Sequence, residues 1–160
     1  MLNKFPISKE GYVKLINEIK NLKKIVRVEI INEISEARKH GDLSENAEYH
    51  AAKERQNFIE SKIIQLENKL LKTEIIDTSK ISSEEIKYGA SIELLDIYLD
   101  KTIVYKIVSD YESDPSEGLI SIFSPFAKVL IGKKINELFS FNTVSRKKKY
   151  RIISINYKNK

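Results

Sequence analysis

The first half of the chain carries two long stripes of apolar residues at helical spacing. Ser8 is a suitable N-cap, and the first stripe then comprises Tyr12, Leu15, Ile19, Leu22, Val26, Ile30, Ile34 and Ala37. The second stripe comprises Ala52, Arg55 or Gln56, Ile59, Ile63, Leu66 and Leu70, and its pattern ends near Lys72. Steps of three and four, with one slip in the first stripe, are typical of a coiled-coil seam. Each stripe predicts a helix of about 30 residues, or about 45 Å at about 1.5 Å per residue.

A short polar segment separates the two predicted helices. Gly41 supplies the positive φ that commonly ends a helix at C′. The second helix begins within a few residues, so the two helices must be antiparallel neighbours. Asp42 and Glu45 lie at the tip of this hairpin and fit a capping box, with Asp42 as N-cap and Glu45 at N3. Carboxylates held so far from any core also suit a chemical role, and the spacing leaves both interpretations open.

The second half of the chain changes to β-like periodicity after Gly89. Strands are predicted near residues 90–95, 102–108, 119–123, 139–144 and 149–157, with a loop over 110–118. Ser124 and Pro125 predict the start of a short helix that Gly132 closes. The sequence therefore predicts an α+β fold, with an antiparallel coiled-coil arm in residues 1–77 and a mostly antiparallel sheet domain in residues 78–160.

Charge is uneven along the chain. Residues 1–77 carry a net charge of +1, residues 78–118 carry −5 and residues 119–160 carry +9. This polarity suggests an oriented approach to a charged partner, although a lysine-rich surface that only solvates the protein explains it equally well. The run from Arg146 to Lys149, with Arg151, could contact nucleic acid. Only Tyr150 interrupts it as an aromatic residue, so we interpret this run mainly as a solvated turn.

Several functional classes are disfavoured. The chain has no cysteine, which excludes a disulfide framework and a thiolate metal site. It has no P-loop, GxGxxG, HExxH or nucleophile-elbow motif, so a self-contained enzyme is not expected. No apolar run matches a signal-peptide core or a membrane span, and we expect a soluble, cytoplasmic protein with no membrane partner.

Two segments resemble a known family. The run EARKHGDLSENAEYHAAKERQ, from Glu36 to Gln56, resembles the bacterial Gre transcript-cleavage factors of the GreA type. The segment SPFAKVLIGK, from Ser124 to Lys133, is similar to the SPxAxxLIGK segment of that family. The order and spacing of the two segments agree with the family, which implies similarity over essentially the whole chain and an FKBP-like second domain.

The resemblance implies a mechanism. Gre factors insert their coiled-coil arm into the secondary channel of a backtracked RNA polymerase, which then cuts the 3′ end of its own nascent RNA. Asp42 and Glu45 would help to hold a second Mg²⁺ there, whereas the free protein would bind no cofactor. The positions that would lie near the RNA are Arg38, Asn46, Tyr49 and Lys53. Lys53 stands where arginine is expected, which would remove a bidentate phosphate contact.

The resemblance also implies a docking segment and leaves two rivals. The residues that would dock on the rim of the channel are Ser124, Pro125, Phe126, Ala127, Lys128, Gly132 and Lys133.

His40 fits the last turn of a helix, where the dipole favours a cation, better than a catalytic base. The family points to a functional monomer. One rival is a Gre-like protein that blocks the channel and inhibits transcription; the other is a coiled-coil adaptor or chaperone with an FKBP-like domain.

Overall fold

The computed structural model describes residues 4–158, which form two compact units. One unit, Tyr12–Thr73, is a helical hairpin, and the other combines Phe5–Gly11 with the chain from Glu74 onward and contains a β-sheet. The fold is α+β, as predicted. Within the described residues, no helix has both the length and the apolar character that a membrane span requires.

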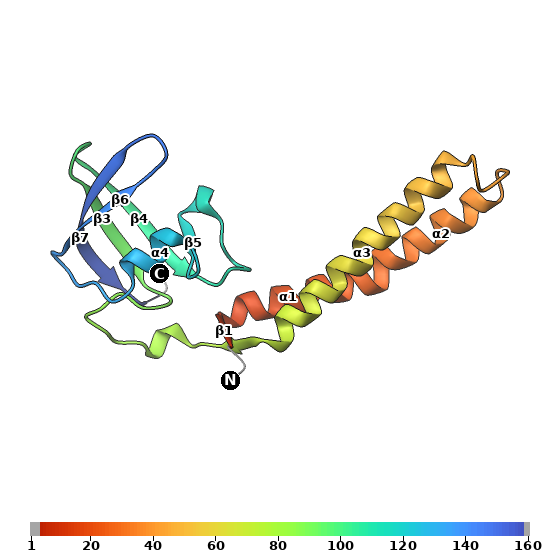
Figure 1. Ribbon diagram of the computed structural model, residues 1–160. Helices are drawn as coiled ribbons and strands as arrows, with labels where there is room; N and C mark the ends of the chain where they lie inside the picture. The colour runs from red at the N-terminus through yellow and green to blue at the C-terminus, as the bar shows by residue number, and fades with distance from the viewer. Residues whose placement is uncertain (1–3, 159–160) are drawn as a thin grey trace. The chain divides into compact units, whose positions relative to one another are not determined.

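The hairpin has one interrupted helical arm and one continuous arm. The first arm consists of α1 (Lys9–Asn21), a π-helical turn (Leu22–Val26) and α2 (Arg27–Arg38), and α3 (Ala47–Leu71) returns beside it (Figure 1). The buried apolar side chains of the first arm are Leu15, Ile19, Leu22, Ile30, Ile34 and Ala37, and those of α3 are Ala52, Ile59, Ile63 and Leu66. These residues belong to the two predicted stripes, so the seam predicted from spacing is confirmed.

The π-helical turn accounts for the slip in the first stripe. Leu22, Val26, Ile30 and Ile34 follow one another in steps of four, and each such step moves a residue about 40° around a regular α-helix. In the turn, the Arg27 N–H donates to the carbonyl of Leu22, five residues back instead of four. This wider turn takes up extra rotation, so Ile30 and Ile34 remain on the face that packs against α3.

Ion pairs border the seam and connect the two arms. Arg27 donates two hydrogen bonds to Glu60, from Nε to Oε1 at 2.7 Å and from Nη2 to Oε2 at 2.8 Å. This contact lowers the pKa of the Glu60 carboxyl and raises the pKa of Arg27. Both side chains remain partly exposed, so solvent screens the attraction and the pair adds little stability. Its fork geometry instead helps to fix the register of the arms.

Two short strands, which flank the helical hairpin in sequence, were not predicted. β1 (Phe5–Ile7) pairs with β2 (Thr73–Ile75), and the Ile76 N–H donates to the carbonyl of Ile7 at 2.9 Å. Ser8 then caps α1 as predicted, because its Oγ accepts the N–H of Gly11 at 2.9 Å. Three-residue strands carry too little alternation to be recognised from sequence.

The second unit is built on a five-stranded sheet. Its strands are β3 (Ser91–Asp96), β4 (Lys101–Val108), β5 (Leu119–Ser121), β6 (Leu138–Asn142) and β7 (Lys147–Asn156), in the order β5-β4-β3-β7-β6. All neighbours are antiparallel except β4 and β5, which are parallel. The loop between them, which contains a 3₁₀ turn (Pro115–Glu117), carries the chain back to Lys106 before β5 begins. A further 3₁₀ turn (Thr78–Lys80) lies in the connection from β2.

One short helix covers the core of the sheet. α4 (Pro125–Leu130) begins as predicted, with Ser124 Oγ accepting the Ala127 N–H at 3.1 Å. Its Phe126 ring packs edge-on against Phe141 and Tyr150, with centroids 5.0 and 5.8 Å away. The buried core comprises Ile86, Ala90, Ile92, Leu94, Ile107, Ile120, Ala127, Leu130, Phe139, Tyr150, Ile152 and Tyr157. The partly buried rings of Phe126 and Phe141 therefore pack against this core.

Two glycines of this unit adopt a left-handed conformation in different surroundings. Gly118 has φ +73°, and a Cβ placed there would lie 2.8 Å from the carbonyl oxygen of Val104. Gly132 has φ +83°, but a Cβ there would meet no atom within 4 Å. The first site demands glycine for both backbone conformation and space, whereas the second demands it for conformation alone.

We predict that Gly118→Ala destabilises the protein more than Gly132→Ala. The left-handed conformation costs each alanine about 1–2 kcal/mol, and only Gly118→Ala adds a clash with Val104. Urea unfolding followed by circular dichroism measures the difference. Equal free energies of unfolding for the two variants would mean that the close approach of Val104 to Gly118 contributes nothing.

Candidate functional site

The tip of the hairpin is a compact turn between α2 and α3. α2 ends at Arg38, and the N–H groups of Lys39 and His40 donate to the carbonyls of Glu36 and Ala37. Gly41 follows with φ +127°, two residues beyond the C-cap instead of at C′. The chain then crosses to α3 through exposed residues.

Asn46 joins the two helices at this turn. Its backbone is extended, and its side-chain Oδ1 accepts the Tyr49 N–H at 3.0 Å, which makes Asn46 the N-cap of α3. Its Nδ2 donates to the carbonyl of Ala37, at the end of α2, at 2.6 Å. One half-buried amide therefore caps one helix and satisfies a terminal carbonyl of the other.

The predicted capping box is wrong. α3 begins at Ala47, so Asp42 lies four residues before the N-cap Asn46 and Glu45 precedes the helix. Asp42 and Asn46 both belong to the preferred N-cap residue types, and the Glu45 spacing favoured the wrong one. Sequence reasoning missed Asn46 as the cap because its second hydrogen bond crosses to another helix.

The two acids are left on the outside of the tip. Asp42 Oδ1 accepts the Ser44 N–H at 3.1 Å, and this hydrogen bond lowers the pKa of the exposed carboxyl. The Asp42 side chain is therefore ionised at neutral pH. Glu45 is exposed and forms no hydrogen bond or ion pair within residues 4–158. Neither acid has a role in holding the helices together.

The tip does not by itself form a complete metal site. Within the described part of the chain, no cluster of three or more His, Asp or Glu side chains could hold an ion. His40, Asp42, Glu45 and Glu48 do border one shallow hollow at the tip, together with Asn46. Two carboxylates can supply part of an oxygen ligand set, and other oxygen donors would have to complete it.

A cationic and aromatic cluster lies beside the tip. The guanidinium of Arg38 stands over the ring of Tyr49, 5.9 Å from its centroid. Lys53 follows Tyr49 by one turn of α3, so the two share a face, and its Nζ donates to Gln56 Oε1 at 3.0 Å. The structure thus brings together Arg38, Asn46 and Tyr49, three of the predicted RNA-proximal residues, with Lys53 adjoining them.

The two histidines of the tip differ from each other in their contacts. His50 Nε2 lies 3.3 Å from the carbonyl oxygen of Ser44, which ties the first turn of α3 to the loop. His40 follows the C-cap of α2, as its predicted place at a helix C-terminus requires. The contact of His50 is a second feature that sequence reasoning missed.

The predicted docking segment is half core and half surface. Ala127 is buried, Phe126 is held in the aromatic cluster, and Lys133 Nζ lies 6.0 Å from the centroid of the Phe139 ring. The exposed residues of the segment are Pro125, Lys128, Ile131 and Gly132. These exposed positions, with the partly exposed Ser124 and Lys133, offer a surface to a partner.

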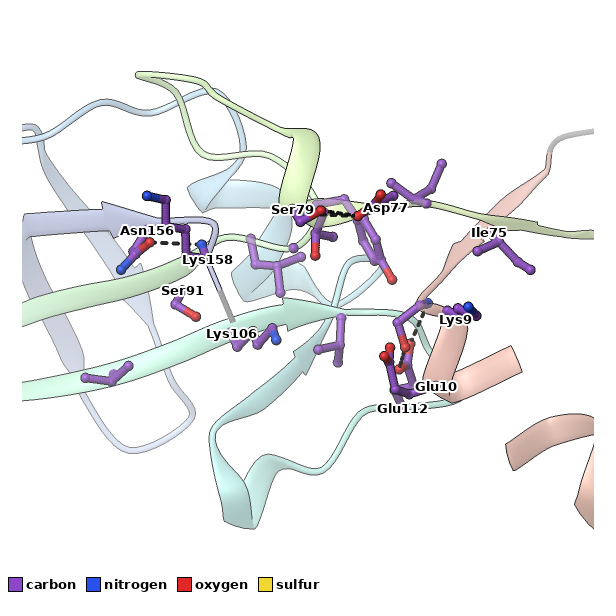
Figure 2. Close-up of a pocket in the computed structure, with 18 of the residues that line it drawn as sticks. Lys9, Glu10, Ile75, Asp77, Ser79, Ser91, Lys106, Glu112, Asn156 and Lys158 are labelled. Atoms are coloured by element: carbon purple, nitrogen blue, oxygen red, sulfur yellow. Dashed lines mark hydrogen bonds between the residues drawn. The ribbon is translucent and has the colours of Figure 1, made fainter. Parts of the chain in front are cut away.

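A larger cavity, of about 900 Å³, lies in the sheet unit (Figure 2). Its lining mixes acids such as Glu93 with lysines such as Lys106, and the Glu112 carboxylate already accepts the N–H of Ser8 at 3.2 Å and the hydroxyl of Ser109 at 2.7 Å. The lining contains no histidine and no cysteine. Because the Glu112 carboxylate is already occupied by Ser8 and Ser109, whereas the acids of the tip are exposed, we regard the hairpin tip as the better candidate.

Comparison with known proteins assigns the chain to a family. Residues 5–75 match the family described as transcription elongation factor, N-terminal, and residues 81–157 match transcription elongation factor, GreA/GreB, C-term. The chain is 45% identical over 158 residues to transcription elongation factor GreA of Rickettsia canadensis, covering 99% of this chain and 98% of that protein. It is 43% identical over 156 residues to GreA of Phenylobacterium zucineum, covering 98% and 99%.

Solved structures of two related proteins also match. GreA factor homolog 1 of Thermus thermophilus is 25% identical, with a TM-score of 0.44 and coverage of 96% of this chain and 99% of that chain. A GreA/GreB factor of Nitrosomonas europaea is 15% identical, with a TM-score of 0.44 and coverage of 96% and 98%. The full-length identity to the GreA proteins and the two consecutive family matches show that the chain belongs to the GreA/GreB family of transcription elongation factors.

Proposed function

We propose that this elongation factor inserts its hairpin into the secondary channel of a backtracked bacterial RNA polymerase and stimulates cleavage of the extruded RNA 3′ end. Cleavage would leave a new 3′ end from which elongation resumes. One observation carries the proposal. Asp42 and Glu45 are exposed at the far end of a hairpin about 45 Å long, and Asn46 holds that end together without them.

The carboxylates would contribute to a magnesium site that the polymerase and its RNA complete. Mg²⁺ usually takes one or two protein carboxylates, with waters and phosphate oxygens filling its octahedron. Asp42 and Glu45 fit this partial role, since both are exposed and Asp42 stays ionised at neutral pH. When bound, Mg²⁺ supplies activation of water and stabilisation of the leaving oxygen. The protein alone would then bind no cofactor and cut no RNA, because the catalytic centre belongs to the polymerase.

The cluster beside the tip would contact the RNA. The Arg38 guanidinium stands over the Tyr49 ring near the end of α2, and its N–H groups would donate to a phosphate. Lys53 adds a second cation on the same face. These groups would orient the RNA backbone while the acids orient the metal and water.

The sheet unit would dock on the rim of the channel through the exposed part of residues 124–133. A Gre-like inhibitor that only blocks the channel would share this docking, and a cleavage assay separates the two. A prolyl-isomerase role is disfavoured because Phe126, Phe139 and Tyr150 pack into one another within the core, and among the residues lining the large cavity the only aromatic is Tyr88. We therefore place the activity at the tip.

We predict that Asp42→Asn slows stimulated cleavage by at least about 10-fold. Loss of a residue that only orients a metal ligand typically costs about 10- to 100-fold. The asparagine keeps an Oδ1 for the Ser44 N–H and loses the charge that attracts metal. Labelled RNA in a stalled, backtracked elongation complex with Mg²⁺ measures the rate, and Glu45→Gln should behave similarly.

Polymerase binding by the same variants is the control. Both should compete with wild type for the elongation complex, since neither change touches the docking residues. Cleavage at the wild-type rate by Asp42→Asn would refute the metal role. Suppression of both cleavage and elongation by the wild-type protein would favour the channel blocker.

We predict that Asn46→Ala loosens the tip and weakens cleavage without weakening docking. Loss of the cap should cost about 0.5–2 kcal/mol locally, and the Ala37 carbonyl loses its partner across the hairpin. Hydrogen exchange at the Tyr49 amide should accelerate, and the Mg²⁺ concentration needed for half-maximal cleavage should rise.

Asn46→Asp is the matched variant for this test. Its carboxylate still accepts the Tyr49 N–H but repels the Ala37 carbonyl, so slow exchange at Tyr49 should return while cleavage stays impaired. Full cleavage activity in Asn46→Asp would show that the cap alone matters and that the bridge to Ala37 does not position the acids.

A further inference from the structure

β7 carries a ladder of cations on the face of the sheet that points away from α4. Lys147, Lys149 and Arg151 are paired with Asn142, Ser140 and Leu138 of β6, and paired residues share a face. The intervening Tyr150 is paired with Phe139 and buried on the opposite, core face. The three cations therefore point in one direction. The run that the sequence suggested as a solvated turn is instead a strand from Lys147 onward.

Within residues 4–158, no acid forms an ion pair with these cations, although Asp96 borders one hollow together with Arg146, Lys147 and Lys148. None of Lys147, Lys149 and Arg151 takes part in an ion pair or a side-chain hydrogen bond. The acid nearest to these cations in sequence is Glu137, whose carboxylate accepts the N–H of Lys134 at 3.1 Å. Asp96 is paired with Tyr150 and so lies on the core face.

Asp96 is also engaged by its own backbone. Its buried Oδ1 accepts the N–H groups of Tyr98 and Leu99 at 3.0 and 3.1 Å. On the cation face itself, the first acid beyond Arg151 is Glu93, which is paired with Ser154 and accepts its hydroxyl at 3.3 Å. The end of β7 nearest the β6–β7 turn therefore carries a net positive charge, since Arg146 and Lys148 outnumber the one acid, Asp96, that borders the same hollow.

The spacing of the ladder suits a polyanion with a regular backbone. Alternate residues of a strand are about 7 Å apart, so three like charges stand in a straight row on a rigid sheet. Ser140 and Asn142 beside the row supply further groups that can hydrogen-bond to phosphate oxygens. A row of lysines and arginine that form no ion pair is typical of a surface that binds the nucleic-acid backbone.

We infer that this face of β6 and β7, defined by Lys147, Lys149 and Arg151 with Ser140 and Asn142, binds the phosphate backbone of double-stranded DNA. Single-strand binding surfaces stack successive bases on exposed aromatic rings. The aromatic residues of β6 and β7 among these rows, Phe139, Phe141 and Tyr150, are on the core face, and the single exposed ring of Tyr98 beside Lys147 offers no platform for successive bases. Contact with phosphates alone carries no base readout, so binding is independent of sequence. The surface lies in the sheet unit and acts independently of the hairpin tip.

The test compares two variants that lose the same charge. Lys147→Gln, Lys149→Gln and Arg151→Gln are combined in one protein, and the exposed arm residues Lys14, Lys20 and Lys24 are changed to Gln in the other. Fluorescence anisotropy of a labelled DNA duplex with the full chain gives the dissociation constant over a range of salt concentrations. Thermal unfolding checks that both variants retain the wild-type fold.

Wild type should bind with a dissociation constant on the order of 10⁻⁵ M near physiological salt. The β7 variant should bind about tenfold or more weakly, and the slope of log K against log salt should fall by about one for each phosphate that the variant no longer neutralises. The arm variant should keep the wild-type slope. Asp42→Asn should bind DNA like wild type, which separates this surface from the cleavage proposal.

Three results would overturn the inference. Equal losses in the two triple variants would mean that only net charge matters. Tighter binding of a single strand than of the duplex would point to base stacking elsewhere. A β7 variant that keeps DNA affinity but loses affinity for RNA polymerase would identify an acidic protein surface as the partner.

Discussion

The side chain of Asn46 is the constraint on which the hairpin tip depends. One amide accepts the first free N–H of α3 and donates to a terminal carbonyl of α2, so the two helix ends become a single hydrogen-bonded unit. Without Asn46 the Tyr49 N–H would be an unsatisfied helix-terminal donor, and the Ala37 carbonyl would keep only the His40 N–H. Because Asn46 joins the two helix ends, Asp42 and Glu45 are not needed for that contact and are exposed. This division of roles suits the part that we propose for the two carboxylates in completing a metal site of the polymerase.

Much of this architecture could be predicted from the sequence because it depends on strong periodic signals. The seam residues from Leu15 to Ala37 and the Ser124–Pro125 helix start follow from spacing and from local backbone chemistry. The N-cap of α3 could not be identified from the sequence, because Asp42 and Asn46 are both preferred N-cap residue types. The contact of Asn46 with Ala37, which decides between them, appears only in the folded hairpin. For the same reason β1 was missed, since its strand character depends on a partner some 70 residues away in sequence. Interactions between distant segments carry no signature in either segment alone.

The two units hold opposite charges in different ways. At the tip, two carboxylates are exposed on a narrow hairpin, and the Ser44 N–H lowers the pKa of the Asp42 carboxyl without neutralising its charge. On β7, the sheet holds cations in a fixed row whose alternate positions are buried core. In both cases the backbone is stabilised by other residues, Asn46 in one and Tyr150 with Phe139 in the other. Charged side chains that do not hold the backbone in place remain available to bind a partner.

The π-helical turn at Leu22–Val26 has a consequence for the aim of the arm. In a regular α-helix, one added residue rotates everything beyond it by about 100°. A turn that closes on the fifth residue absorbs most of that rotation. A relative with one residue fewer and a regular helix here would thus present its tip to the same side. The direction in which the carboxylates point therefore does not depend on whether the arm contains this one extra residue.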